Sequence, residues 1–124
     1  MRYALRSTNS SLRWTPDLIS ANSSRIALID CKSRMTSRTT NRHAVERAAV
    51  TAHLQLTAWT QLPIYYVFDN LDVLTPYDAL TTGRNSPRTT AGSGTAYYLI
   101  PSHHAQPFET TFGTPHPHPT ASAA

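Results

Sequence analysis

The sequence predicts a fold that combines helices and strands, α/β (α+β), with a mixed central sheet, a β-hairpin and a flanking crossover helix. Two apolar runs, Arg25–Lys32 and Ile64–Phe68, are typical of buried strands. Between them, residues 42–60 carry apolar side chains at helical spacing. A strand, a helix and a second strand in this order favour a crossover that places both strands in one sheet.

The chain length and composition fit one domain, which we place at residues 1–113 of the 124. Apolar residues make up 40% of the chain and charged residues 15%, which supports a modest core. No apolar run reaches the roughly 18 residues of a membrane-spanning helix, and the N-terminus lacks the apolar region of a secretory signal. The single cysteine, Cys31, favours a reducing, cytoplasmic compartment, and we expect no membrane partner.

The first two expected strands form a hairpin. Leu12–Ile19 contains Pro16, which indicates an edge position or a bulge. A polar cluster at residues 20–24 predicts a turn into Arg25–Lys32. The run of four apolar residues, Ile26–Ile29, is expected where both faces of a strand are covered. A turn this short favours an antiparallel pair.

A loop and the crossover helix come next. Residues 33–41 are polar and lack an apolar pattern, so we expect a loop. The helix is predicted over Arg42–Thr60, with Asn41 as its N-cap. Its apolar stripe consists of Val45, Ala48, Ala49, Ala52, Leu56 and Trp59. Pro63 then separates the helix from the central strand Ile64–Phe68.

The C-terminal half contains shorter elements. Asp69–Leu74 is expected to be a turn with room for a short strand. Thr75 as N-cap and Pro76 at the first helical position predict a short helix that ends near Leu80. A loop over residues 81–94 leads to a last strand, Tyr97–Ile100. Residues 114–124 have no core-forming side chains and are predicted to be a disordered tail.

Two acids and a lysine converge on the predicted hairpin. Because side chains alternate along a strand, Asp30 and Lys32 point to the same face, and the hairpin brings Asp17 alongside them. Two carboxylates a few ångströms apart repel each other, and a divalent cation removes this repulsion. We therefore expect Mg²⁺ or Mn²⁺ to be held by Asp17 and Asp30, with the backbone carbonyl of Cys31 as a further oxygen ligand. The thiol of Cys31 faces the opposite side of the strand, where we expect it to be buried and inert.

This arrangement suits the hydrolysis of a phosphodiester bond. A bound metal ion stabilises charge on a phosphoryl group and lowers the pKa of a ligated water. Lys32 is the only lysine of the chain, and its compact charge suits orienting water or stabilising the transition state. A structural alternative stays open at this point: Asp30 and Lys32 as a same-face ion pair, with Asp17 as an acid beside the turn.

The charge balance is compatible with a nucleic acid partner. Ten arginines and one lysine face seven acids, and the isoelectric point is near 9.6. Arg34, Arg38 and Arg42 follow the predicted site in the polar stretch, where they are candidates for contacts with DNA phosphates. A solvated loop explains these three arginines equally well.

The order of these features resembles the PD-(D/E)XK nuclease superfamily. Asp17 follows a proline, and after 12 further residues Asp30-Cys-Lys32 closes an apolar strand that leads to a helix and another strand. The resemblance covers Leu12–Phe68 and implies a restriction-endonuclease-like sheet. It also implies that Asp17 and Asp30 bind the metal and that Lys32 is the catalytic lysine. Gln55-Leu-Thr-Ala-Trp loosely resembles a Gln-x-x-x-Tyr element of some members, which makes Gln55 a candidate nucleic acid contact.

One departure from the family pattern leaves the activity open. Many members carry a further acid on a helix before the first aspartate, whereas no acid precedes Asp17 here. Glu46 is the obvious substitute as a metal ligand, although an acid in the first turn of a helix also stabilises the helix. The leading hypothesis is a Mg²⁺-dependent DNA endonuclease, which could act as a homodimer to cut both strands. The alternatives are a catalytically degenerate protein that binds nucleic acid or a protein partner, and an N-terminally truncated family member, a structural fragment whose open sheet edge self-associates.

Overall fold

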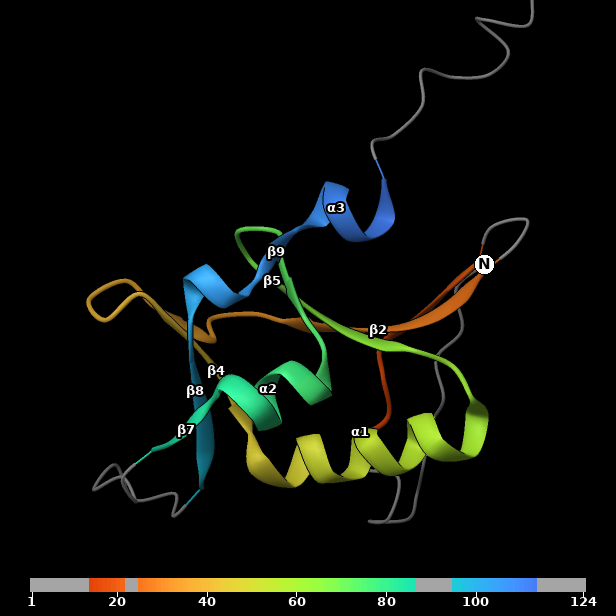
Figure 1. Ribbon diagram of the computed structural model, residues 1–124, viewed down its shortest axis with the longest axis horizontal. Coiled ribbons are helices and arrows are strands. Elements are labelled where there is room, and N and C mark those ends of the chain that lie inside the picture. The colour runs from red at the N-terminus through yellow and green to blue at the C-terminus, as the bar shows by residue number, and fades with distance from the viewer. Residues whose placement is uncertain (1–13, 22–24, 87–94, 114–124) are drawn as a thin grey trace, which may run out of the picture.

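The computed structural model describes residues 14–21, 25–86 and 95–113, which form two sheets and three α-helices (Figure 1). A five-stranded sheet has the order β1 (Leu18–Ala21), β2 (Ile26–Lys32), β5 (Ile64–Phe68), β6 (Asp72–Leu74) and β9 (Gln106–Pro107). A four-stranded sheet has the order β3 (Thr36–Ser37), β4 (Arg42–Glu46), β8 (Tyr97–Pro101) and β7 (Arg84–Asn85). The helices are α1 (Arg47–Thr60), α2 (Pro76–Thr82) and α3 (Phe108–Phe112), and a 3₁₀ turn spans Ser102–His104.

The mixed sheet and the crossover are confirmed. Strand β1 runs antiparallel to β2 as a hairpin, and β2 runs parallel to β5 through the intervening helix α1. Strand β1 lies at the edge of its sheet, as Pro16 indicated, but it begins only at Leu18. Pro16 has no amide hydrogen to donate to a strand ladder, and it precedes β1 together with Asp17. Residues 12 and 13 of the expected strand lie outside the described part.

The predicted helix over residues 42–60 is wrong in its first five residues, which form strand β4. Burial alternates there: His43 and Val45 are buried and their neighbours are more exposed. This period of two arises because β4 pairs antiparallel with β8 along its whole length. Asn41 is therefore not the N-cap. Glu46 occupies that position, without a capping hydrogen bond from its side chain.

The buried face of α1 also differs from the predicted stripe. Ala49, Val50 and His53 are the buried residues of the helix, whereas Trp59 is 78% exposed. The predicted stripe began at Val45, which belongs to strand β4 and not to the helix. The helical spacing counted from Val45 therefore predicted the wrong buried face for α1.

The later elements follow the sequence closely. Thr75 and Asp78 form a capping box, Pro76 opens α2, and the helix continues to Thr82. The last predicted strand is β8, one residue longer than expected. The loop over residues 33–41 contains the two-residue strand β3, and the stretch from residue 81 contains β7. The predictions for residues 22–24, 87–94 and 114–124 fall outside the described residues.

The core lies between the two sheets and the helices α1 and α2. Its fully buried members come from all four of these parts: Val45, Val50, Tyr66, Phe68, Leu74, Ala79 and Ile100. His43 links the sheets through this core. Its Nε2 lies 2.7 Å from Oδ2 of Asp72, its Nδ1 lies 2.7 Å from the hydroxyl of Thr36, and its ring stacks on Phe68.

Figure 1 shows α1 and α3 on opposite faces of the five-stranded sheet, with α1 below β2 and β5 and α3 above them. The side chains that alternate along β2 and β5 are therefore divided between two different environments. None of the helices in the described residues has the length and apolar character that crossing a bilayer requires.

Candidate active site

The β1–β2 hairpin places the two predicted acids opposite each other. Leu18 pairs with Ile29, so the next position toward the open end sets Asp17 against Asp30. In the parallel ladder on the other side of β2, Asp30 pairs with Tyr66. Tyr66 contacts α1 through His53, so the acids lie on the sheet face that α1 covers.

Asp17, Asp30 and Lys32 come together as the sequence predicted. The Nζ atom of Lys32 lies 2.8 Å from Oδ2 of Asp30, and these two side chains are 13% and 12% exposed. Asp17 is more exposed, and its Oδ2 accepts a hydrogen bond of 2.8 Å from the backbone amide of Cys31. The hairpin thus holds one carboxylate by a backbone donor and the other by an ammonium group.

The environment of Asp30 opposes its ionisation. Burial raises the pKa of the Asp30 carboxyl from 3.8 to about 6, the charge and hydrogen bond of Lys32 oppose this rise, and the neighbouring Asp17 adds to it. The ammonium of Lys32 therefore does not offset the cost of burying the ionised carboxylate of Asp30. Such a carboxylate is suited to a further positive charge.

This pKa predicts a measurable pH dependence of stability in metal-free protein. Because the folded pKa of Asp30 lies above its unfolded value, the protonated folded form is favoured. The contribution is fully present below pH 4 and is lost as the pH rises through about 6, a change of about 3 kcal/mol. Urea unfolding in EDTA should therefore show the stability of wild type falling relative to Asp30→Asn over this range. A difference between the two proteins that stays constant from pH 4 to pH 8 would contradict the assignment.

A buried polar chain behind the acids was not predicted. Nδ1 of His53 lies 2.7 Å from the hydroxyl of Tyr66, and Nε2 of His53 hydrogen-bonds the backbone carbonyl of Trp14. The ammonium of Lys32 lies over the ring of Tyr66, 5.1 Å from its centroid. The available signal was a histidine on the buried face of a helix, because a buried imidazole requires hydrogen-bond partners.

The remaining proposed metal ligands lie as follows. The backbone of Cys31 belongs to the site strand, and its side chain faces away from Asp30 as expected. The thiol is exposed, however, so the prediction of a buried thiol is wrong: the buried stretch of β2 ends at Asp30, one residue before Cys31. Glu46 lies in the other sheet, opposite Tyr97. In the described residues, no three histidine, cysteine or acidic side chains gather as a ready-made metal site.

The proposed nucleic acid contacts are all exposed. Arg34 lies two residues after the end of the site strand, with a φ of 59°, and its amide donates to Oδ2 of Asp69 at 2.8 Å. Arg38 and Arg42 belong to the β3–β4 hairpin, which projects to the left as the orange-to-yellow loop of Figure 1. Gln55 lies roughly 200° around α1 from His53. The helix therefore presents His53, and not Gln55, to the acidic site.

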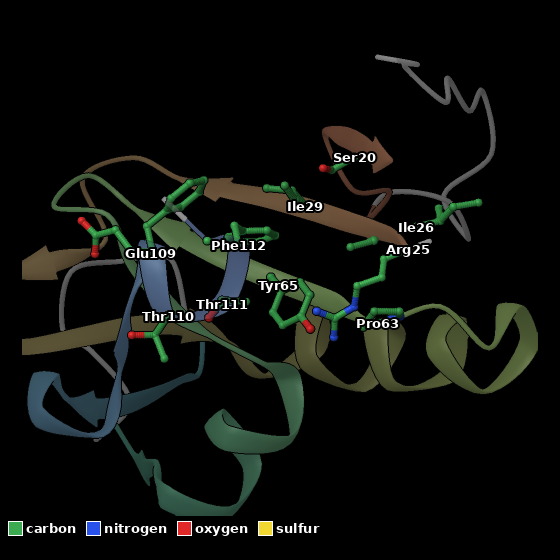
Figure 2. A pocket seen from close by; sticks show the side chains of 13 residues that line it. Ser20, Arg25, Ile26, Ile29, Pro63, Tyr65, Glu109, Thr110, Thr111 and Phe112 are labelled. Carbon is green, nitrogen blue, oxygen red and sulfur yellow. The ribbon is translucent and has the colours of Figure 1, made fainter. Parts of the chain in front are cut away.

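A cavity of about 650 Å³ lies on the opposite face of the same sheet (Figure 2). Ile29, Tyr65 and Phe112 surround it, and Arg25 and Glu109 lie toward opposite sides of the view. Ile29 and Tyr65 alternate with Asp30 and Tyr66 along their strands, so they face away from the acids. The cavity and the acidic site are separate features.

The architecture is similar to that of a known nuclease. The fold resembles Hjc, a Holliday junction resolvase from Archaeoglobus fulgidus, with a TM-score of 0.56 and 9% sequence identity over 91% of this chain and 83% of that chain. No protein-family model matches the sequence, and a comparison with curated proteins finds no match. Hjc has the PD-(D/E)XK nuclease fold, so the resemblance stated from the sequence is confirmed at the level of the fold.

Proposed function

We propose that the chain is a metal-dependent endonuclease that hydrolyses phosphodiester bonds in DNA. The observation that carries the proposal is the convergence of Asp17, Asp30 and Lys32 on one hairpin, with 2.8 Å between the ammonium of Lys32 and the carboxylate of Asp30. The nuclease fold supports it, because the three residues occupy the hairpin that leads into the crossover helix.

The residues present fit a magnesium or manganese ion. Asp17 and Asp30 would hold the ion, with the carbonyl oxygen of Cys31 as a further candidate, and such hard oxygen donors are what Mg²⁺ prefers. The raised pKa of Asp30 is compatible with this assignment, since a second cation would stabilise the ionised carboxylate that burial disfavours. When bound, the ion supplies charge stabilisation at the phosphoryl group and a water of lowered pKa.

The protein's own groups orient the substrate around this point. Lys32 is held between the Asp30 carboxylate and the ring of Tyr66, so its ammonium presents a fixed positive charge to the oxygens of the scissile phosphate. The amide of Cys31 keeps the carboxylate of Asp17 turned toward the same place. Arg34, Arg38 and Arg42 then contact phosphates along the duplex on one side of the site.

The first experiment is a titration of Mg²⁺ and Mn²⁺ into wild type and Asp30→Asn with labelled DNA, followed on a denaturing gel. A four-way junction, a linear duplex and a single strand are compared as substrates, because the solved structure with a similar fold is that of a Holliday junction resolvase. Cleavage that requires both the metal and Asp30 supports the proposal. Salt-dependent DNA binding without cleavage would instead favour a catalytically degenerate nuclease-fold protein.

The arginines of the β3–β4 hairpin should control how tightly DNA is bound. Arg38→Ala and Arg42→Ala are each expected to weaken binding and to reduce the slope of log K against log salt by roughly 0.9 for each phosphate that is no longer neutralised. Arg25→Ala is the matched control, because it removes the same charge from the opposite face of the sheet. Fluorescence anisotropy at several salt concentrations measures the slopes. Equal slopes for all three variants would remove the hairpin from the interface.

A further inference from the structure

We infer that His53 is a positioning residue for the acidic site, and that its imidazole fixes the segment that carries Asp17. The catalytic consequence rests on the proposed nuclease function, whereas the structural consequence does not. His53 belongs to α1, far from the acids in sequence, and neither the spacing of the acids nor the lysine motif points to it.

The hydrogen bonds of His53 define the role. The side chain is 1% exposed, and both ring nitrogens have partners. The carbonyl of Trp14 can only accept, so Nε2 of His53 carries the hydrogen. Nδ1 is then an acceptor, and the hydroxyl of Tyr66 donates to it. The two partners fix one neutral tautomer and one ring orientation.

The Trp14 carbonyl lies three residues before Asp17, at a point where strand pairing has not begun. The ladder between β1 and β2 starts at Leu18, after Asp17. Two contacts thus hold the segment of Asp17. The strand ladder lies on its C-terminal side, and the hydrogen bond that His53 donates to the Trp14 carbonyl lies on its N-terminal side. Both contacts constrain where its carboxylate meets the amide of Cys31.

The second partner of His53 connects to the rest of the site. The ring of Tyr66 lies beneath the ammonium of Lys32, and Tyr66 pairs with Asp30 across β2 and β5. The imidazole of His53 therefore hydrogen-bonds both the segment that carries Asp17 and the tyrosine whose ring lies under Lys32. An apolar side chain of the same size would fill the space but would hold neither partner. Groups that hydrogen-bond directly to metal ligands typically change metal affinity by about 10–100-fold when they are removed. His53 acts one contact further away, through the segment that carries Asp17.

Three variants of His53 separate positioning from packing. His53→Phe keeps the approximate volume and removes both hydrogen bonds. His53→Asn places an amide near the Nδ1 position and does not reach Trp14, whereas His53→Gln retains a donor near the Nε2 position. Val50→Ala is the matched control, because Val50 is buried on the same face of α1.

The readout independent of activity is amide hydrogen exchange by NMR. The exchange rate of the Cys31 amide, which donates to Asp17, is compared with that of the Leu28 amide. Leu28 lies in the same strand as Cys31 and serves as the reference, because its amide donates to the carbonyl of Pro63 at 2.9 Å. In His53→Phe and His53→Asn, we expect the ratio of Cys31 to Leu28 exchange to rise at least about tenfold and Mn²⁺ affinity to fall about tenfold or more. His53→Gln should restore most of both, and Val50→Ala should leave the ratio unchanged.

The outcomes are distinguishable. If His53→Phe or His53→Asn changes the exchange ratio no more than Val50→Ala does, His53 only packs and the inference is overturned. Should His53→Phe fail to fold, the comparison of His53→Asn with His53→Gln decides, and equal ratios in those two overturn it. If the ratio responds as expected while wild type neither binds Mn²⁺ nor cuts DNA, the proposed function fails and the positioning role stands.

Discussion

Asp30→Asn is expected to abolish metal-dependent cleavage, with a rate at least about 10³-fold below wild type. The amide keeps the shape of the side chain but removes the charge that would hold the ion. An ion that polarises a phosphoryl oxygen lowers the reaction barrier by several kcal/mol, and each 1.36 kcal/mol is about tenfold in rate. Single-turnover cleavage of labelled DNA, at the metal concentration that saturates wild type, measures the loss.

The control for this variant is Glu109→Gln, which removes an exposed acid on α3, on the other face of the sheet. It should cleave within about twofold of wild type, because α3 and the acids lie on opposite sides of β2 and β5. Asp30→Asn should keep its fold by circular dichroism. Undiminished metal-dependent cleavage in Asp30→Asn would remove the hairpin acids from the reaction.

Lys32→Met is expected to lower cleavage by about 10²–10³-fold while DNA binding changes little. The variant keeps the apolar stem of the side chain and removes the ammonium that lies 2.8 Å from Asp30. Lys32→Arg should not restore activity, since a guanidinium is planar and wider than the ammonium in a position only 13% exposed. Single-turnover rates and anisotropy on the same DNA separate chemistry from binding.

Lys32→Met should also change how metal binding depends on pH. Lys32 lowers the pKa of Asp30 against the effect of burial, so its removal raises that pKa above about 6. The midpoint of Mn²⁺ binding against pH should therefore move to higher pH than in wild type. A midpoint that stays in place, together with full cleavage, would leave Lys32 as a structural ion-pair partner of Asp30 without a role in the reaction.

The acidic site was predictable because its determinants are local. Strand alternation puts Asp30 and Lys32 on one face, and a short turn puts Asp17 opposite them. The cap of α2 was equally local, since Thr75 and Asp78 satisfy each other within four residues. These features depend on neighbours in sequence, which a single chain displays directly.

The features that were missed depend on distant partners. Residues 42–46 carry His43 and Val45 two apart, and five residues are too few to separate a strand from the start of a helix. These residues form a strand because they pair with β8, which lies more than 50 residues later in the sequence. His53 was missed for the same reason, because its partners Trp14 and Tyr66 come from two other segments.

The parallel pairing of β2 with β5 has a consequence for the order in which the site forms. Leu28 and Ile64 are 36 residues apart in sequence, so this pairing closes a long loop, whereas the β1–β2 hairpin closes a short one. Local contacts generally form faster than distant ones. We therefore expect the two acids to meet early in folding, and Tyr66 and His53 to reach them only when the crossover closes.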